Sequence, residues 1–412
     1  MNELFVTTMH RNYDFGGKPL MANDDLTSVV LRSVGLREDR IAALMRLTGG
    51  TFNTVTRVTL TNGDDWVVKV PPPAIDGTLM SHERDLLVNE VEFYTCTAGT
   101  APVPRVLHSQ LDPASPTGPY LIVSALPGRP WSDVADDIAA HDAAATRSAA
   151  PDASVPGASI PKASAPGAAT PGAAAPGASV PGAAAPGAAV PGTSAPDAEE
   201  RRLRNALGRI VGRTHSLTGS GGFGYPGQAL GPLSATWRQA FTAMTDAVLA
   251  DADAYRARLP RPTADIRALL AAASPVLDDV TRPAPVHFDL WQGNLLVDGE
   301  PGARSLGGIV DGERMFWGDP VADFVSLSLF ADPEDDEDLL TGYAEGSGQP
   351  MVFDASARLR LALYRCYLYL IMLVETVPRR VPREQLDWTW REVGPQLVRA
   401  LGDVESALRS GD

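Results

Sequence analysis

The chain has 412 residues and a formal net charge of −15, with 35 basic and 50 acidic side chains. This balance argues against non-specific nucleic-acid binding and favours the attraction of cationic ligands. The two cysteines, Cys96 and Cys366, indicate neither a disulfide framework nor a zinc site, so a reducing cytoplasm is the expected compartment. The most apolar segment, 361–374, contains Arg365 and is too short to cross a bilayer, so we expect a buried helix there.

The first part of the chain predicts an irregular extension, a helix and a β-hairpin. Residues 1–24 show neither a periodic pattern nor a secretion signal, and a helix is expected from Thr27. Residues 47–60 have the pattern of strand, glycine turn and strand. A Gly-Gly pair is more often a plain hairpin turn, but it also lets backbone amides approach phosphate oxygens. On that interpretation the nucleotide-binding candidates are Gly49, Gly50, Thr51 and Asn53.

The next two elements predict a lysine on a strand and a glutamate on a helix that can reach it. Lys69 lies in the β-rich run 65–70, where a lone lysine is usually an edge-strand charge. After a glycine turn, however, it becomes a candidate for binding the α- and β-phosphates of a nucleotide. Ser81 is the expected N-cap of the following helix. Glu90 lies nearer the apolar stripe and is the expected partner of Lys69, whereas Glu83 is expected to face solvent.

A buried strand over residues 119–126 is stopped by the Pro-Gly pair at 127–128. We expect this segment to be a hinge between two lobes, where the backbone meets the edge of an adenine ring. Ser124 and Leu126 are the nucleotide-binding candidates at the hinge.

A proline recurs at every fifth residue between Pro151 and Pro196, in units close to Pro-Gly-Ala-Ala/Ser-x. Glycine at every fifth position excludes a collagen triple helix, which requires glycine at every third. Proline at this density breaks helices and central strands, and small side chains bury too little area to offset chain entropy. We therefore predict a disordered, low-complexity insertion over 146–198, and we interpret it as an inert loop rather than a tether for a partner.

The chain beyond the insertion looks mainly helical. Apolar residues at helical spacing predict a helix that ends near His215, whose expected role is a structural cap of that helix. The acidic run 332–338 resembles a site for a cationic ligand. Asp332 as an N-cap and Pro333 as the first helical residue explain the run better, because acids belong in a first helical turn.

The most informative segment, 286–297, has the pattern H-x-D-x-x-x-x-N, and the next apolar strand ends in Asp311. Phosphoryl transfer from a nucleotide needs a carboxylate that orients and deprotonates a hydroxyl, and oxygen ligands that hold magnesium. Asp289 can supply the first, and Asn294 and Asp311 can supply the second. An isolated H-x-D motif is also typical of a carboxylate that caps backbone amides, but here four other motifs precede it in the right order.

Together these motifs resemble the aminoglycoside phosphotransferase family, which shares its protein-kinase-like fold with choline and fructosamine kinases. The resemblance covers residues 27–375 apart from the insertion. It implies that Lys69 and Glu90 are the phosphate-gripping pair, that Asp289 is the base, and that the magnesium ligands are Asn294 and Asp311. It also implies that Asp323 braces the catalytic loop, residues 287–294, through hydrogen bonds. His287 is expected to pack beneath that loop rather than titrate, and the acceptor-side candidates are Trp291, Glu313, Arg314 and Trp317.

The expected fold is therefore α+β and bilobal, with a mixed β-sheet N-lobe at 25–126 and a mainly helical C-lobe at 127–412. The resemblance implies ATP and Mg²⁺ as cofactors and a small-molecule hydroxyl as acceptor. That acceptor would be an aminoglycoside-like or other antibiotic, as in a resistance enzyme. We expect no nucleic acid, no membrane and no obligate protein partner.

Two alternatives remain for the function. The sequence around Trp291 in the catalytic loop also resembles that of fructosamine kinases. The acceptor could therefore be a metabolite such as fructosamine, a sugar amine or choline. A nucleotide-binding pseudokinase scaffold is the second alternative. The intact set of Lys69, Asp289, Asn294 and Asp311 argues against a scaffold, which has no need of all four.

Overall fold

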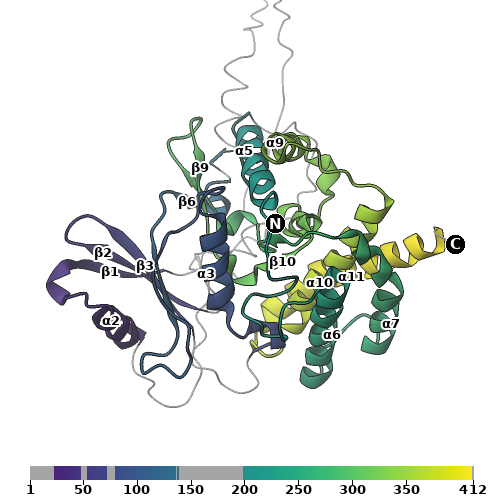
Figure 1. The fold of residues 1–412 in the computed structure, drawn as a ribbon, viewed down its shortest axis with the longest axis horizontal. Coiled ribbons are helices and arrows are strands. Elements are labelled where there is room, and N and C mark those ends of the chain that lie inside the picture. Colours follow the sequence, from purple (N-terminus) through teal and green to yellow (C-terminus); the bar gives the residue numbers. More distant parts are fainter. Residues whose placement is uncertain (1–22, 48–52, 72–78, 136, 139–197, 411–412) are drawn as a thin grey trace, which may run out of the picture.

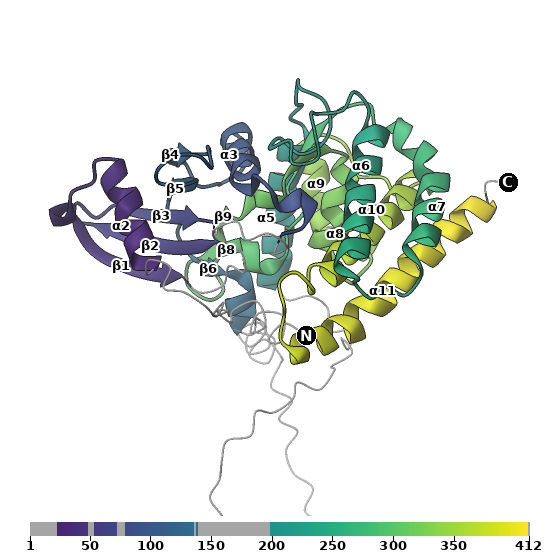
Figure 2. The same ribbon diagram turned by 90° about the horizontal axis from the view of Figure 1, so that it is seen from below.

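The chain forms the expected α+β fold of two lobes (Figure 1). A computed structural model describes residues 23–47, 53–71, 79–135, 137–138 and 198–410. One lobe is built around a β-sheet and the other from packed helices, which Figure 2 shows gathered on the side away from the sheet.

The N-terminal lobe is a five-stranded sheet in the order β1-β2-β3-β5-β4. All of its described pairings are antiparallel, so the expectation of a mixed sheet is wrong. The strands and flanking helices are β1 (Ile41–Leu47), β2 (Thr54–Leu60), β3 (Asp65–Val70), β4 (Val106–Gln110), β5 (Tyr120–Ser124), α2 (Asn23–Ser33) and α3 (Leu86–Thr97), with the 3-10 turn η1 (Glu38–Arg40) before β1.

The two faces of this sheet differ because side chains alternate along a strand. On β3, Val68 and Val70 belong to the small core under α2, where Val30 and Leu31 pack against them. Lys69 lies between the two valines and therefore points to the opposite face, toward α3. The strand period thus carries the lysine to the junction of the lobes.

The segment before α3 differs from the prediction. Ser81 does not cap a helix; it begins a 3-10 turn, η2 (Ser81–Glu83), and α3 starts after a break. A tertiary contact explains the difference, because the N–H and Oγ of Ser81 donate to the Asp251 carboxylate at 2.7 and 2.6 Å. The expectation that Glu83 faces solvent is also wrong, since its side chain is buried and paired with Arg379.

The C-terminal lobe combines helices with two small antiparallel sheets. The helices are α5 (Ala198–His215), α6 (Trp237–Tyr255), α7 (Thr263–Ala273), α8 (Phe324–Leu327), α9 (Glu337–Ser347), α10 (Ala355–Val374) and α11 (Arg383–Ser410). One sheet pairs β7 (Ala284–Val286) with β10 (Phe316–Gly318), and the other has the order β6 (Arg129–Pro130), β8 (Leu295–Asp298) and β9 (Ser305–Ile309). The remaining 3-10 turns are η3 (Ser274–Asp279), η4 (Gln292–Asn294), η5 (Gly312–Arg314), η6 (Pro320–Asp323) and η7 (Pro333–Asp335).

An aromatic core fills the C-terminal lobe directly beneath the predicted catalytic loop. Trp237 stacks on Phe316 with ring centroids 5.4 Å apart, and its Nε1 donates to the Tyr364 hydroxyl at 2.7 Å. Phe288 belongs to the loop and packs against Phe316 and Tyr367 at 5.1 and 5.6 Å. The loop is therefore anchored in the core by one of its own side chains.

Helices α5 and α9 cross at close range through glycines. A Cβ at Gly208 or Gly212 would overlap backbone oxygens of α9, and one at Gly342 or Gly346 would overlap backbone oxygens of α5. Each helix spaces its glycines four residues apart, which places both on one face. The absence of side chains on this face permits the contact.

Several helix predictions can be compared with the structure. Segment 361–374 lies in α10 and is largely buried, as expected, and no described helix has the length and apolarity needed to span a bilayer. Asp332 accepts the N–H of Glu334 at 3.1 Å at the start of η7, which confirms the capping interpretation. His215 ends α5 as expected, but its ring contacts Tyr343 and Asp323 instead of capping the helix.

The predicted domain boundaries stay predictions, because the extension and the insertion lie largely outside the described residues. The helix expected from Thr27 begins earlier, at Asn23, whereas the rest of the predicted extension lies outside the described residues. The predicted insertion also lies outside them until α5 begins at Ala198. The lobe boundary at residue 126 stays a prediction.

Candidate active site

Lys69 lies between two carboxylates at the junction of the lobes. Its Nζ is 2.5 Å from Glu90 Oε1, on α3, and 2.7 Å from Asp311 Oδ1, after β9. Burial alone would lower the pKa of Lys69, but the charges of Asp311 and Glu90 outweigh it and hold the pKa well above its ordinary value. β3 is an interior strand, so the edge-strand interpretation of this lysine is wrong.

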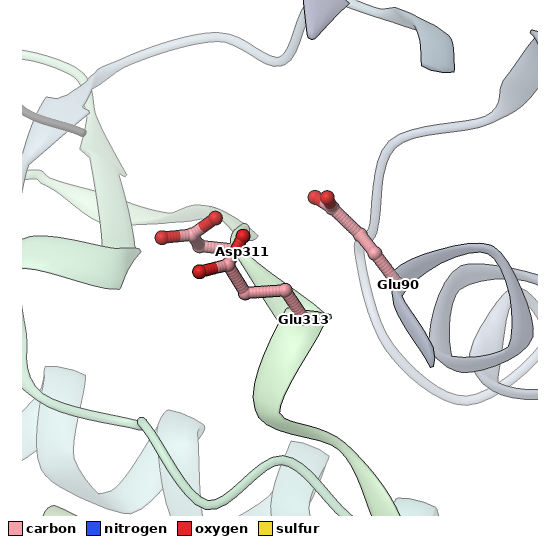
Figure 3. A group of neighbouring side chains, drawn as sticks. All are labelled: Glu90, Asp311 and Glu313. Atoms are coloured by element: carbon pink, nitrogen blue, oxygen red, sulfur yellow. The ribbon is translucent and has the colours of Figure 1, made fainter. Parts of the chain in front are cut away.

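Asp311 belongs to a cluster of three carboxylates with Glu90 and Glu313 (Figure 3). One oxygen of each lies within 4.8 Å of the others, and Figure 3 shows Glu90 reaching from α3 toward the other two. Carboxylates this close repel one another unless a cation lies among them, and the ammonium of Lys69 is such a cation. Glu90 Oε2 is buried without a hydrogen-bond partner among the described residues. Carboxylate oxygens are also the ligands that Mg²⁺ prefers, but the Lys69 ammonium already lies between Glu90 and Asp311, so Asp311 is the predicted magnesium ligand of this cluster.

Tyr94 is a residue of this site that the sequence analysis missed. Its hydroxyl donates to Glu90 Oε1 at 2.6 Å and accepts the backbone N–H of Asp311 at 2.9 Å. Tyr94 follows Glu90 by four residues and so lies on the same helix face. That spacing was the available signal, but a tyrosine is equally typical of the apolar face of a helix.

The catalytic loop connects β7 to β8 and is strained at Phe288. The φ angle of Phe288 is +64°, which is unusual for a large side chain. The Asp323 carboxylate holds this conformation, because it accepts the N–H of Phe288 at 2.6 Å and that of His287 at 3.2 Å. Its Oδ2 also bonds His215 Nε2 at 2.8 Å, which explains why that ring is turned inward. This is the arrangement that the predicted bracing role requires.

Both ring nitrogens of His287 contact the backbone. Nε2 is 3.0 Å from Val310 O, and Nδ1 accepts the N–H of Asp289 at 3.2 Å. The ring is buried and meets Phe93 edge-on with centroids 4.8 Å apart. These contacts favour a packing role over proton transfer.

Asp289 and Asn294 face one another across the loop. Asn294 Nδ2 donates to the carbonyl oxygen of Asp289 at 2.9 Å and to its Oδ2 at 3.2 Å. With the nitrogen so engaged, the amide oxygen is the atom that Asn294 offers to a cation. Burial raises the pKa of Asp289, while the nearby Arg314 guanidinium opposes the rise. A raised pKa suits a carboxylate that must take a proton.

Arg314 lies beside this base. Its Nε is 3.9 Å from Asp289 Oδ2, and its NH2 group is 3.1 Å from Glu375 Oε2. The arginine was an acceptor-side candidate, and its position next to Asp289 is compatible with that prediction.

Glu313 contacts Asn53, the residue before β2, and Asn89 on α3. Asn53 Nδ2 donates to its Oε2 at 2.8 Å, and Asn89 Nδ2 donates to its backbone oxygen at 3.1 Å. Burial, followed by the charge of Asp311, raises the pKa of Glu313 well above its ordinary value. These contacts lie on the side of Lys69, so they favour a nucleotide-side position for Glu313. The other candidates of the turn, Gly49, Gly50 and Thr51, lie outside the described residues.

The remaining candidates lie at the hinge and around the loop. Ser124 ends β5 and its Oγ accepts the N–H of Arg105 at 2.9 Å. Leu126 packs so closely on Gly308 that a Cβ there would overlap it, and the ring of Trp291 similarly covers Gly293. Trp317 is buried in β10, where its backbone pairs with Gly224, so packing accounts for it. The binding roles of these residues stay predictions.

Comparison with known proteins places this geometry in a family. The model of the phosphotransferase enzyme family matches residues 43–362, which is most of the chain. No curated protein matches the sequence.

Solved structures with the same fold are similar over almost their whole length. An aminoglycoside phosphotransferase, APH(4)-Ia, is 16% identical, with 95% of this chain and 100% of that chain covered and a TM-score of 0.51. A protein assigned as a fructosamine-3-kinase from Thermobifida fusca YX-ER1 is 19% identical, with 93% and 99% covered and a TM-score of 0.51. A variant of aminoglycoside 2′-phosphotransferase-IIIa in complex with GDP is 16% identical, with 92% and 99% covered and a TM-score of 0.50. The chain belongs to the phosphotransferase enzyme family and has its bilobal, protein-kinase-like fold.

Proposed function

We propose that this protein transfers the γ-phosphoryl group of ATP to a hydroxyl group of a small molecule. One observation carries the proposal: Lys69 contacts both Glu90 and Asp311, while Asp289 and Asn294 face each other in the adjacent loop. Phosphoryl transfer depends on positioning and charge stabilisation more than on covalent chemistry, and these residues supply both.

Each side chain has one task in this proposal. Lys69 is held by Glu90 and binds the α- and β-phosphates. Asp289 orients the acceptor hydroxyl and takes its proton as the oxygen attacks. Asn294 and Asp311 hold Mg²⁺, which neutralises phosphate charge when it is bound.

We propose an aminoglycoside-like or other antibiotic as the acceptor. The net charge of −15 favours polycationic acceptors, and two of the similar structures are named for aminoglycosides. A metabolite kinase is the second candidate, because another similar structure is assigned as a fructosamine-3-kinase. The acceptor pocket is the variable part of a shared fold, so the acceptor must be found by assay.

The decisive test measures ADP release from Mg·ATP, and GDP release from Mg·GTP as a second donor, across a panel of aminoglycosides, peptide antibiotics and sugar amines. Asp289→Asn is expected to lower acceptor-dependent turnover roughly 10³-fold and to leave nucleotide affinity nearly unchanged. The matched control is Asp298→Asn, an exposed acid at the end of β8, which should behave as wild type. Turnover near wild type in Asp289→Asn would refute the base assignment. Nucleotide binding without turnover for any acceptor would favour the pseudokinase.

A further inference from the structure

A chain of alternating charges leads from the catalytic loop to the segment before α3. Arg314 Nε lies 3.9 Å from Asp289 Oδ2, and Arg314 NH2 lies 3.1 Å from Glu375 Oε2. The same Glu375 oxygen is 3.2 Å from Arg379 NH1, and the other end of that guanidinium pairs with Glu83. Each charge in the chain therefore has a neighbour of opposite sign.

The chain is shielded from water along most of its length. The side chains of Glu83, Arg314, Glu375 and Arg379 are 3–17% exposed, whereas Asp289 is 28% exposed. Buried ion pairs rarely stabilise a fold more than apolar packing of the same volume does. These ion pairs are therefore better explained by positioning than by stability. A buried guanidinium fixes the positions of the carboxylates with which it pairs.

The far end of the chain is fixed to the C-terminal lobe. Glu83 Oε2 accepts the N–H of Met80 at 2.9 Å, and the neighbouring Ser81 is bonded to Asp251 on α6. This short segment leads directly into α3, the helix that carries Glu90. The ion chain thus connects the support of α3 with the loop of Asp289.

We propose that Glu375 and Arg379 are positioning residues that hold Arg314 beside Asp289 and tie this pair to the segment leading into α3. The catalytic loop and α3 come from distant parts of the sequence, and both must be placed correctly for Asp289 and Lys69 to act together. Glu375 lies at the C-terminal end of α10 and bonds both arginines through a single oxygen. Loss of its charge removes the carboxylate that the two arginines share, so Arg314 is no longer held in place and can shift relative to Asp289.

The catalytic part of this inference rests on the proposed function, and its test compares Glu375→Gln with wild type. Glutamine keeps the shape of the side chain and removes its charge. We expect kcat to fall roughly 10- to 100-fold, as for a displacement of about 1 Å at the reacting group, with KM for ATP changed less than about twofold. Arg379→Lys keeps the positive charge but loses the two-sided guanidinium group. Its kcat should lie between that of wild type and that of Arg379→Gln.

Glu334→Gln is the matched control. Glu334 forms a two-point pair with Arg358 at 2.8 Å in the same lobe, but both side chains are far more exposed. Breaking that pair should change neither kcat nor KM. Thermal unfolding of every variant separates loss of folded protein from loss of positioning.

Amide hydrogen exchange of the catalytic-loop peptide, 287–294, gives a readout that does not require turnover. Faster exchange of this peptide in Glu375→Gln but not in Glu334→Gln, together with the kcat loss, supports the proposal. A wild-type kcat in Glu375→Gln overturns it. If wild type itself has no turnover with any acceptor, the proposed function fails separately. In that case amide hydrogen exchange of the 287–294 peptide is the test. An exchange rate in Glu375→Gln equal to that in Glu334→Gln overturns the positioning role.

Discussion

His82 shows how burial sets the charge of a single residue beside the ion chain. The imidazole is 1% exposed, stacks on Tyr225 with ring centroids 6.1 Å apart, and leaves Nδ1 without a partner among the described residues. Burial lowers the pKa of His82 to about 4. The nearby Glu83 carboxylate opposes this shift but does not cancel it. The ring is therefore neutral in the folded protein at pH 7.

This depressed pKa predicts that acid destabilises the fold through His82. The unfolded chain takes up a proton below about pH 6.5, whereas the folded chain does so only near pH 4, so the free energy of unfolding falls as pH falls between these values. From pH 7 to pH 5 this one group should remove about 2 kcal/mol. Urea unfolding at both pH values should show a smaller decrease in His82→Gln.

The control for this prediction is His108→Gln, because His108 is exposed on β4. Its pH dependence should match that of wild type. Equal pH dependence in His82→Gln and wild type would show that the imidazole is protonated equally in the folded and unfolded states.

The crossing of α5 and α9 has no room for an added methyl group. A Cβ at Gly342 would overlap the backbone of Asn205, and backbone atoms cannot move aside as a flexible side chain can. We expect Gly342→Ala to lower the free energy of unfolding by about 3 kcal/mol, at the upper end of overpacking costs. Chemical denaturation measures the change.

Gly402→Ala is the matched substitution at a helix position where no atom lies close to the added methyl group. A Cβ at Gly402, in α11, meets nothing within 4 Å, so alanine should raise the free energy of unfolding by about 0.5–1 kcal/mol through helix propensity. A Gly342→Ala variant that gained stability as well would mean that α5 and α9 lie further apart.

At the scale of the whole molecule, Arg304 contacts the segments that precede and follow the predicted insertion. Its NH2 group is 3.9 Å from Asp137 Oδ2, before the insertion, and its NH1 group is 3.3 Å from Glu199 Oε2, after it. The Glu199 carboxylate also accepts the N–H groups of Gly302 and Arg304 at 3.0 and 2.8 Å. The hairpin between β8 and β9 therefore contacts the chain on both sides of the predicted insertion, and its contacts with Glu199 are the closer ones.

Deletion of residues 149–195 should accordingly leave folding and nucleotide binding intact. A shorter closed loop costs less entropy, so the free energy of unfolding should rise by on the order of 1 kcal/mol. Denaturation and nucleotide titration of the shortened chain measure both effects. Arg304→Gln in the full-length chain should instead be destabilising. Loss of nucleotide binding on deletion would assign the segment a role in the site.

Much of the site could be predicted because its chemistry lies in short motifs. The residue types and spacing of Asp289, Asn294 and Asp311 indicate phosphoryl transfer before any fold is known. The strand period likewise determines which face of the sheet Lys69 occupies. Residue type, spacing and strand period are local properties, so they can be read from neighbouring residues in the chain.

Tertiary structure alone decided the contacts between distant segments. Glu83 has the local pattern of a solvated helix residue, yet it is buried because Arg379, nearly three hundred positions away, neutralises it. Ser81 begins a turn rather than capping a helix because Asp251 binds its N–H and hydroxyl, and His215 turns inward to Asp323 for the same kind of reason. A polar side chain follows its strongest available partner, and when that partner lies on another element only the packed fold brings it within reach.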